Sequence, residues 1–318
     1  PEYSQIGSFG TMLGINRIEA VMTASYLCNK YGLDTIETGN MLAWVMELYE
    51  KNLIPDSLLD GVKPEWGNEE AVYQLIEMIA NRRGLGDILA DGMKTAVERL
   101  GPETGYYALH IKGMGILLSD DRPVPSFSLG LATATRGADH LRSRPAIDLY
   151  GLPKEVLNNL YGGEVSPDYT SYEGKSRMVW WHELQYAVGD ALGLCRFQMK
   201  FISVNAPSYD EWVRLIYYAT GMEYSKQQLV DVGERIVTLE RMLNIRFGFS
   251  RKDDTLPERY FVEPTVAGLP KVRNRKIDRN AFDKLLDEYY MLHGWDANGV
   301  PRQETLERLG LLAAPEAE

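Results

Sequence analysis

The chain has 318 residues, a formal net charge of −11 and 45% hydrophobic residues. This length is enough for two domains with a large core, and the acidic balance argues against nucleic-acid binding, which needs a basic surface. No apolar run approaches the length of a membrane span and no secretory leader is visible, so we expect a cytoplasmic protein.

Helical periodicity dominates the first hundred residues. The spacing of apolar residues predicts helices over 16–31, 35–51, 68–83 and 87–100. Gly32 is expected to end the first helix, because a helix commonly stops at a glycine that takes a left-handed conformation. Asn68 is expected to cap the third helix, whose first turn carries two acidic side chains.

The pattern changes to a Gly- and Pro-rich segment over 105–128, which predicts a short strand or an extended crossing. We place a domain boundary near residue 112, which gives helical domains over 1–112 and 113–318. The second domain is expected to hold an extended basic stretch over 247–276 and helices over 129–140, 154–161, 172–188, 209–220, 225–246, 278–293 and 303–309. The predicted fold class is mainly α, with little sheet.

Common catalytic and metal-binding motifs are missing from the sequence. Two cysteines, Cys28 and Cys195, cannot form a disulfide framework in a chain this long, and a buried free thiol is the simplest interpretation of each. Gly84-x-Gly86 lacks the third glycine and the βαβ context of a dinucleotide fingerprint, and no P-loop or zinc spacing occurs. The four histidines are scattered, so a hydrogen-bonded structural role is the default for each of them: His110, His140, His182 and His293.

His140 has a more suggestive setting than the other three histidines. Residues 135–144 hold three arginines, an aspartate and this histidine beside a run of small residues. An imidazole near cations and a carboxylate could donate or accept a proton, and the arginines could bind phosphate or carboxylate groups. A solvated charge cluster is an equally good interpretation of this stretch alone.

Two similar hexapeptides lie about 160 residues apart, Asn29–Asp34 and Asp190–Cys195. In each, a predicted helix ends near a glycine, which can take a positive φ and expose backbone N–H groups. A carboxylate or amide at such a turn could bind the N–H donors of a heterocycle, and a cysteine there could ligate iron. Two ordinary helix ends are the alternative interpretation.

At these residues the chain resembles the aldehyde:ferredoxin oxidoreductases, which carry a tungsten bis-pterin cofactor. The resemblance covers essentially the whole chain, as the second and third domains of that family. It is carried jointly by residues 1–3, 27–36, 136–142, 190–195, 233–236, 239–241, 248–254 and 286–290.

The resemblance implies a role for several residues of this sequence. One pterin would be bound by the first hexapeptide, through Asn29, Gly32, Leu33 and Asp34, and the other by the second, through Asp190, Gly193 and Leu194. Cys195 would be the fourth ligand of a [4Fe-4S] cluster, whose other ligands would lie in a C-x-x-C-x-x-x-C run before Pro1. Glu2 and His140 would be the acid/base residues, and a magnesium ion could bridge the pterin phosphates.

The activity implied is the oxidation of an aldehyde to a carboxylic acid at tungsten or molybdenum. Electrons would leave through the cluster to ferredoxin or to an iron–sulfur electron-transfer subunit. The site would be completed by the protein's own N-terminal domain, so we expect a fragment that is inactive alone. Homodimer formation is left open, and no Glu-x-x-His pair supports an iron site between subunits.

The sequence departs from the family pattern at two places. Asn29 stands where an aspartate is usual, and Gly115 and Leu117 stand where a glutamate and a proline are usual. The small Gly115 suggests an alternative, in which a larger pocket accepts an aryl-CoA thioester, as in benzoyl-CoA reductase. A further alternative is a metal-free helical interaction domain, against which the cysteine beside Asp190 argues.

Overall fold

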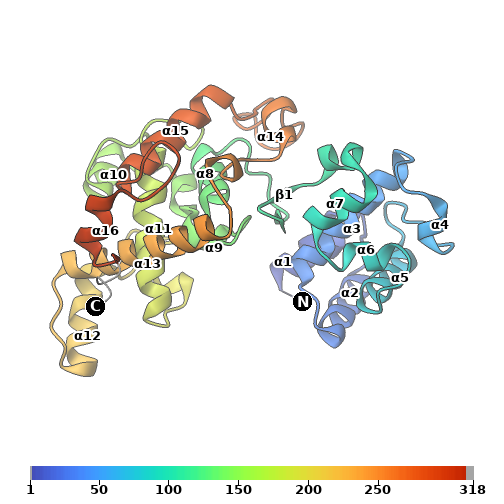
Figure 1. The fold of residues 1–318 in the computed structure, drawn as a ribbon, viewed down its shortest axis with the longest axis horizontal. Helices are drawn as coiled ribbons and strands as arrows, with labels where there is room; N and C mark the ends of the chain where they lie inside the picture. Colours follow the sequence, from blue (N-terminus) through green and yellow to red (C-terminus); the bar gives the residue numbers. More distant parts are fainter. Residues whose placement is uncertain (1, 313–318) are drawn as a thin grey trace, which may run out of the picture. The chain divides into compact units, whose positions relative to one another are not determined.

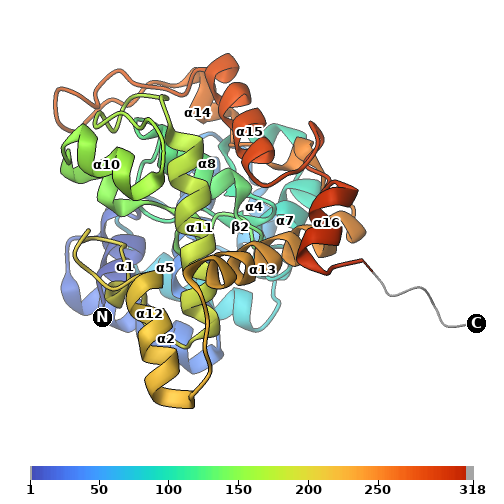
Figure 2. The ribbon, with the colours of Figure 1, turned by 90° about the vertical axis from the view of Figure 1, so that its left-hand side faces the viewer.

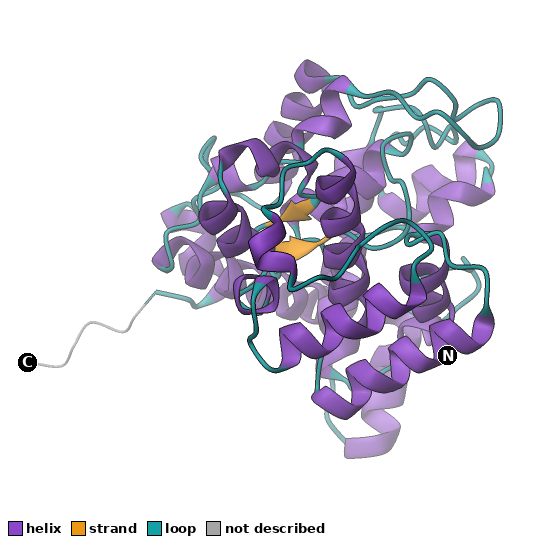
Figure 3. Cartoon of the chain, turned by 90° about the vertical axis from the view of Figure 1, so that its right-hand side faces the viewer, coloured by secondary structure: helices purple, strands orange, loops and turns teal. Residues whose placement is uncertain are grey.

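The computed structural model describes residues 2–312 and is mainly helical, with a single two-stranded sheet among those residues (Figures 1 and 3). The predicted fold class is therefore confirmed. The chain forms two compact units. Unit 1 comprises the residues up to Asp120 with 136–138 and 256–259, and unit 2 comprises 121–135, 139–255 and the residues from 260 on. The domains expected over 1–112 and 113–318 stay a prediction.

Unit 1 is built from short helices followed by a β-hairpin. Asn68 caps α5 as expected, since its side-chain oxygen accepts the backbone N–H of Ala71 at 3.2 Å. The hairpin pairs His110 with Gly115 and Ile111 with Met114 in antiparallel register. The elements are α1 (Tyr3–Ile6), η1 (Gly7–Thr11), α2 (Ile18–Tyr31), α3 (Thr35–Glu50), α4 (Asp56–Leu59), α5 (Glu69–Ala80), α6 (Leu85–Leu89), α7 (Met93–Leu100), η2 (Pro102–Tyr107), β1 (His110–Ile111) and β2 (Met114–Gly115).

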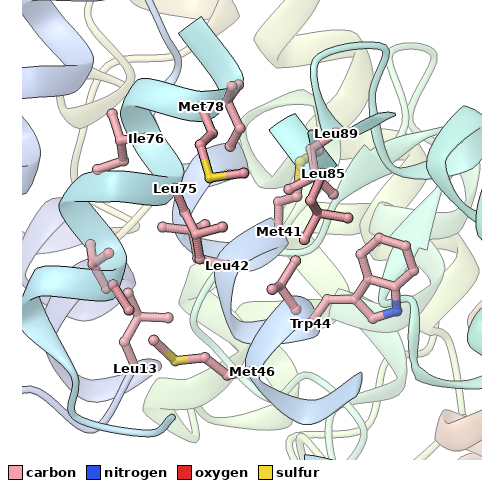
Figure 4. Close-up of a cluster of buried hydrophobic side chains, with 14 of the residues drawn as sticks. Leu13, Met41, Leu42, Trp44, Met46, Leu75, Ile76, Met78, Leu85 and Leu89 are labelled. Atoms are coloured by element: carbon pink, nitrogen blue, oxygen red, sulfur yellow. The ribbon is translucent and has the colours of Figure 1, made fainter. Parts of the chain in front are cut away.

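The core of unit 1 forms around α3, whose side chains are buried on most sides (Figure 4). Met41, Leu42 and Met46 of α3 pack with Leu75 of α5 in one apolar cluster. A helix that is apolar nearly all round is expected at the centre of a helical unit. Gly86 shows how closely α6 approaches α5, because an added Cβ would lie 2.1 Å from the backbone carbonyl carbon of Met78. The glycine pair at 84–86 therefore has a packing role.

Unit 2 is organised around the long helix α11, which packs against α8, α9, α13 and α15 (Figure 2). A Cβ at Gly233 of α13 would lie 2.5 Å from the carbonyl oxygen of Leu184, so α13 crosses α11 at backbone contact. Ser225 and Gln228 form the expected capping box at the start of α13. The elements are α8 (Pro125–Thr133), α9 (His140–Ser143), η3 (Ala146–Tyr150), α10 (Lys154–Tyr161), α11 (Lys175–Ala191), η4 (Arg196–Gln198), α12 (Tyr209–Thr220), α13 (Lys226–Arg246), η5 (Arg251–Asp253), α14 (Glu258–Val262, of which the first two residues are assigned to unit 1), α15 (Arg279–Leu292) and α16 (Gln303–Leu309).

Two of the predicted helices are wrong in extent. The helix expected over 87–100 is two helices, α6 and α7, because the chain breaks at Gly92 with a φ of +86°. The helix expected over 129–140 ends at Thr133, and the chain then turns through Gly137, whose φ is +106°. A Cβ at Gly137 would lie 2.5 Å from the carbonyl oxygen of Ile111, so only glycine fits this close approach to the hairpin. The stretch over 247–276 is also less extended than expected, since it contains η5 and α14.

Candidate functional site

The first hexapeptide forms a Schellman turn at the end of α2. Gly32 takes the left-handed conformation with a φ of 72° and a ψ of 31°. The N–H of Leu33 donates to the carbonyl oxygen of Cys28 at 2.9 Å, and the N–H of Gly32 to that of Asn29 at 3.4 Å. These are the two bonds that define the motif, and they satisfy carbonyl groups that the end of the helix would otherwise leave without a partner.

The second hexapeptide folds into the same turn at the end of α11. Gly193 has a φ of +71°, the N–H of Leu194 donates to Gly189 O at 2.9 Å, and the N–H of Gly193 donates to Asp190 O at 3.0 Å. The residue after each leucine is extended, since Asp34 has a φ of −68° and a ψ of 128° and Cys195 a φ of −68° and a ψ of 138°. The similarity between the two hexapeptides is therefore one of backbone structure as well as of sequence.

The side chains of the two turns have different partners. In the first turn Asp34 caps α3, because its carboxylate accepts the backbone N–H of Glu37 at 2.7 Å, while Asn29 is exposed. In the second turn the carboxylate of Asp190 lies beside two arginines, Arg196 and Arg142. Each turn thus places a side-chain oxygen, from an amide or a carboxylate, next to a stretch of backbone that its glycine leaves exposed. A Cβ on Gly32 or Gly193 would meet no atom within 4 Å.

The two cysteines differ in their surroundings. Cys28 is buried in α2, and burial raises the pKa of its thiol to about 11, which is the behaviour of an inert structural thiol. Cys195 is exposed, so the expectation of a buried thiol is wrong at this position. The exposure follows from the turn, which leaves Cys195 in the extended residue between α11 and η4. The thiol of Cys195 is therefore accessible to a group that is not part of residues 2–312.

Arg196 is the residue that fixes the second turn, and the sequence alone gave no reason to select it. One guanidinium nitrogen of Arg196 donates to both oxygens of Asp190, at 2.9 and 3.0 Å. The guanidinium lies 4.0 Å from the ring centroid of Tyr186, and its other terminal nitrogen contacts the sulfur of Met199 at 3.2 Å. Its only available sequence signal was its position directly after Cys195.

The segment around His140 meets the second turn within unit 2. His140 begins the short helix α9, which Asp139 caps by accepting the N–H of Leu141 at 2.9 Å. Arg142, two residues later in α9, contacts Asp190 at 3.5 Å and forms a two-oxygen ion pair with Glu240 of α13. The hydroxyl of Thr135 donates to Glu240 at 2.7 Å. Thr135, Arg142, Asp190 and Glu240 are therefore joined by one set of hydrogen bonds and ion pairs within unit 2.

Glu2 stands at the start of α1 in unit 1, where it is exposed and its backbone N–H donates to Gln5 Oε1 at 3.1 Å. His140 belongs to unit 2. The acid/base roles expected for these two residues stay predictions.

The other histidines have structural partners, as expected by default. His182 is fully buried, its Nε2 lies 2.9 Å from the hydroxyl oxygen of Tyr161, and burial lowers the pKa of its imidazole to about 3. His293 is buried with its Nε2 at 3.1 Å from Glu183 Oε2. His110 Nδ1 accepts the N–H of Gly113 at 3.3 Å across the hairpin turn, and burial lowers its pKa.

The space beside Gly115 is occupied, which corrects the expectation of a larger pocket there. A Cβ at Gly115 would lie 2.3 Å from Asn40 Nδ2 and 2.8 Å from Glu37 Oε2. The amide of Asn40 donates to Leu109 O at 3.0 Å, so this side chain is fixed between α3 and the hairpin. The missing side chain at Gly115 therefore allows β2 to approach α3 and does not enlarge a cavity.

Among residues 2–312, no three His, Cys, Asp or Glu side chains gather in a way that could hold a metal ion, and no helix is both long and apolar enough to cross a bilayer.

Comparison with known proteins identifies the family. A family model described as aldehyde ferredoxin oxidoreductase, domains 2 and 3, matches residues 1–311. The tungsten-containing aldehyde ferredoxin oxidoreductases of Pyrococcus furiosus and Thermococcus kodakarensis are 33% and 34% identical over 314 residues, which is 98% of this chain and 48% of each relative. A Pyrococcus furiosus protein described as aliphatic sulfonate oxidoreductase, WOR-like subunit, is 28% identical over 98% of this chain and 46% of its own.

A solved structure shares the fold. It is described as the active site complex BamBC of benzoyl coenzyme A reductase with 1,5-dienoyl-CoA, and it superposes with a TM-score of 0.76 at 24% identity, over 97% of this chain and 48% of that one. The chain spans about half the length of the curated relatives it matches. Because the family match covers nearly all residues, the chain belongs to the aldehyde ferredoxin oxidoreductase family, as its second and third domains.

Proposed function

We propose that this chain is the helical part of an oxidoreductase that oxidises aldehydes to carboxylic acids at a tungsten or molybdenum bis-pterin centre. The observation that carries the proposal is the pair of matching Schellman turns, Asn29–Asp34 and Asp190–Cys195. Each of the two equivalent turns is suited to bind one pterin. The family relationship supports the same cofactor class.

The chemistry of the two turns fits a pterin. A pterin ring presents N–H donors, and each turn begins with a side-chain oxygen, from Asn29 in the first and Asp190 in the second. The outer side of Gly32 and of Gly193 is open, so a planar ring could approach the backbone of each turn. Leu33, Leu194 and Asp34 would complete the two binding turns, and a magnesium ion could bridge the phosphates of the pterins.

The residues of this chain would bind, orient and exchange protons. The exposed thiol of Cys195 would provide one ligand of a [4Fe-4S] cluster. When bound, the metal cofactor supplies two-electron redox chemistry and the cluster passes electrons on singly. His140 and Glu2 would move protons to and from the substrate, since both side chains can gain or lose a proton and neither is fully buried.

The partners follow from the same proposal. Electrons would pass to ferredoxin or to an iron–sulfur electron-transfer subunit, and an N-terminal domain would complete the cofactor site. Because the chain spans about half of its relatives, we expect residues 1–318 alone to be inactive. A cytoplasmic location stays a prediction.

The reductive alternative, acting on an aryl-CoA thioester, loses the feature that favoured it. It relied on a pocket opened by Gly115, and that space is filled by Asn40 and Glu37. The likeness to the benzoyl coenzyme A reductase structure is a likeness of fold. A metal-free interaction domain would give no reason for an exposed cysteine at the second of two matching turns.

Metal and pterin analysis of the full-length protein tests the proposal. We expect tungsten or molybdenum, extractable pterin and aldehyde-dependent reduction of a viologen dye. The absence of both metals and of pterin would rule out both enzyme functions. Metal with aryl-CoA turnover, and no turnover of aliphatic or aromatic aldehydes, would favour the reductive alternative.

A further inference from the structure

The carboxylate of Asp190 is held between two guanidinium groups that come from different parts of unit 2. Arg196 reaches it from η4 with two hydrogen bonds of 2.9 and 3.0 Å. Arg142 reaches it from α9 with a contact of 3.5 Å. Asp190 itself is the last-turn residue of α11, at the start of the second Schellman turn. One carboxylate therefore links three segments.

Arg196 is held in place by three residues, Asp190, Met199 and Tyr186. Its side chain is only 10% exposed. The guanidinium stacks over Tyr186, one of the fully buried core residues, and its second terminal nitrogen contacts Met199. Arg196 follows Cys195 directly in the sequence, so fixing its side chain also restricts where the thiol of Cys195 can lie.

Arg142 is fixed by a separate set of contacts. Both oxygens of Glu240 accept from one of its guanidinium nitrogens, and Glu240 also accepts the hydroxyl hydrogen of Thr135. The Arg142 side chain is 18% exposed and that of Glu240 is 31% exposed, so solvent screens this pair only in part. Arg142 lies two residues after His140 on the four-residue helix α9. A helix this short is not stable alone, so its position depends on such contacts.

We propose that Arg142 and Arg196 form an arginine clamp on Asp190, which fixes His140 and Cys195 relative to each other. This rests on the proposed function, in which Asp190 binds a pterin, Cys195 ligates the cluster and His140 exchanges protons. The clamp makes both arginines positioning residues. Movement at the second turn is then passed through Asp190 to α9.

The chemistry of arginine suits this role better than that of lysine. A planar guanidinium presents several N–H donors in fixed directions, so Arg142 can face Glu240 with one nitrogen and Asp190 with the other. A lysine ammonium is a single point of charge and would favour one of the two carboxylates. Replacement by lysine should therefore keep the charge and weaken the link between Glu240 and Asp190.

The test is hydrogen–deuterium exchange on the full-length protein, with Arg142→Gln, Arg142→Lys and Arg196→Lys. We expect Arg142→Gln to speed exchange about tenfold both in residues 139–144 and in residues 190–195, since the two segments share one support. Arg142→Lys should give a smaller increase in the same two segments, and Arg196→Lys should also loosen both. With cofactor retained, kcat should fall about tenfold while KM changes less than about twofold.

The matched control is Lys226→Gln, which breaks an exposed ion pair between α12 and α13, the helix that carries Glu240. It should leave exchange in both segments unchanged. If Arg142→Gln loosens residues 139–144 alone, the clamp is wrong and Arg142 only stabilises α9. Should that variant fail to fold, Arg142→Lys decides by the same comparison. The exchange measurement needs no turnover, so a wild-type protein without metal would refute the proposed function and still leave the clamp testable.

Discussion

The carboxylate of Glu37 accepts the backbone N–H of Gly115 at 2.6 Å and so joins the first turn of α3 to the hairpin β1–β2. Glu37 lies one turn after Asp34, which caps the same helix. The side chain of Glu37 thus connects α3, the helix that begins at the end of the first hexapeptide, to the hairpin. Burial raises the pKa of the Glu37 carboxyl above its ordinary value of 4.5, although the N–H of Gly115 opposes the shift.

This raised pKa predicts a pH dependence of stability. The folded chain binds the proton of Glu37 more tightly than the unfolded chain, so the contribution of this group is most favourable below pH 4.5 and declines as the pH rises through the folded pKa. Glu37→Gln keeps an acceptor oxygen and removes the buried charge. We expect the variant to gain stability relative to wild type as the pH is raised, measured by urea unfolding at acid and at mildly alkaline pH. The exposed Glu50→Gln on the same helix is the control, and a relative loss for Glu37→Gln at high pH would contradict the prediction.

A side chain at position 115 should be poorly tolerated. Gly115→Ala would place its Cβ 2.3 Å from Asn40 Nδ2, so one of the packed polar side chains must move and give up its hydrogen bond. We expect a loss of about 1–3 kcal/mol in the free energy of unfolding. Gly10→Ala is the matched control, because its nearest contact would be an ordinary 3.4 Å. Equal stability of the two variants would show that the space beside Gly115 is open after all.

Local sequence rules accounted for most helices and for both hexapeptide turns, because caps and apolar spacing act over a few residues. The capping box of Ser225 and Gln228 and the end of α2 at Gly32 both form as the neighbouring residues in the sequence imply. The rules failed where a distant segment decides the conformation. The helix expected to reach residue 140 ends at Thr133, and Gly137 instead packs on Ile111, a contact that no pattern near residue 137 reveals.

The same distinction applies to the candidate site. The turn residues could be selected from the sequence, since each hexapeptide is self-contained. Arg196 and Glu240 could not, because their roles depend on Asp190 and Arg142, which lie on other elements of unit 2. The expectation of a pocket at Gly115 was wrong for a related reason, since the side chain of Asn40 in α3 fills that space.

A buried ion pair in unit 2 gives a stability prediction unrelated to the site. The ammonium of Lys175 donates to Asp148 at 2.6 Å and to Ser166 O at 2.9 Å, and both charged side chains are 0% exposed. Lys175→Met would leave the Asp148 carboxylate buried without its counter-charge. We expect a loss of about 3–5 kcal/mol in the unfolding free energy of unit 2, measured by urea unfolding.

The control for this variant is Lys226→Met, which removes an ammonium from an exposed pair with Asp210. Its stability should stay close to that of wild type, because solvent screens such pairs. A small effect of Lys175→Met, similar to that of Lys226→Met, would mean that Asp148 is neutralised by other means.

The different exposure of the two thiols can be measured directly on residues 1–318. We expect one rapid equivalent of reaction with a thiol reagent in the native chain and a second only on unfolding, because Cys195 is exposed and Cys28 is buried with a pKa of about 11. Cys195→Ser should abolish the rapid equivalent, and Cys28→Ser should retain it. Two rapid equivalents in the native chain would show that α2 opens readily.

Cys195 should also decide the fate of the cluster in the full-length protein. Cys195→Ala removes the one cluster ligand that this chain would provide, so we expect the electron paramagnetic resonance signal of the reduced cluster to be lost or strongly altered. Cys28→Ala is the matched control, since it removes a buried thiol at the equivalent helix end without touching the second turn. Its spectrum should match that of wild type. An unchanged spectrum in Cys195→Ala would contradict the ligand assignment, and with it the proposed difference between the turn that ends in Asp34 and the turn that ends in Cys195.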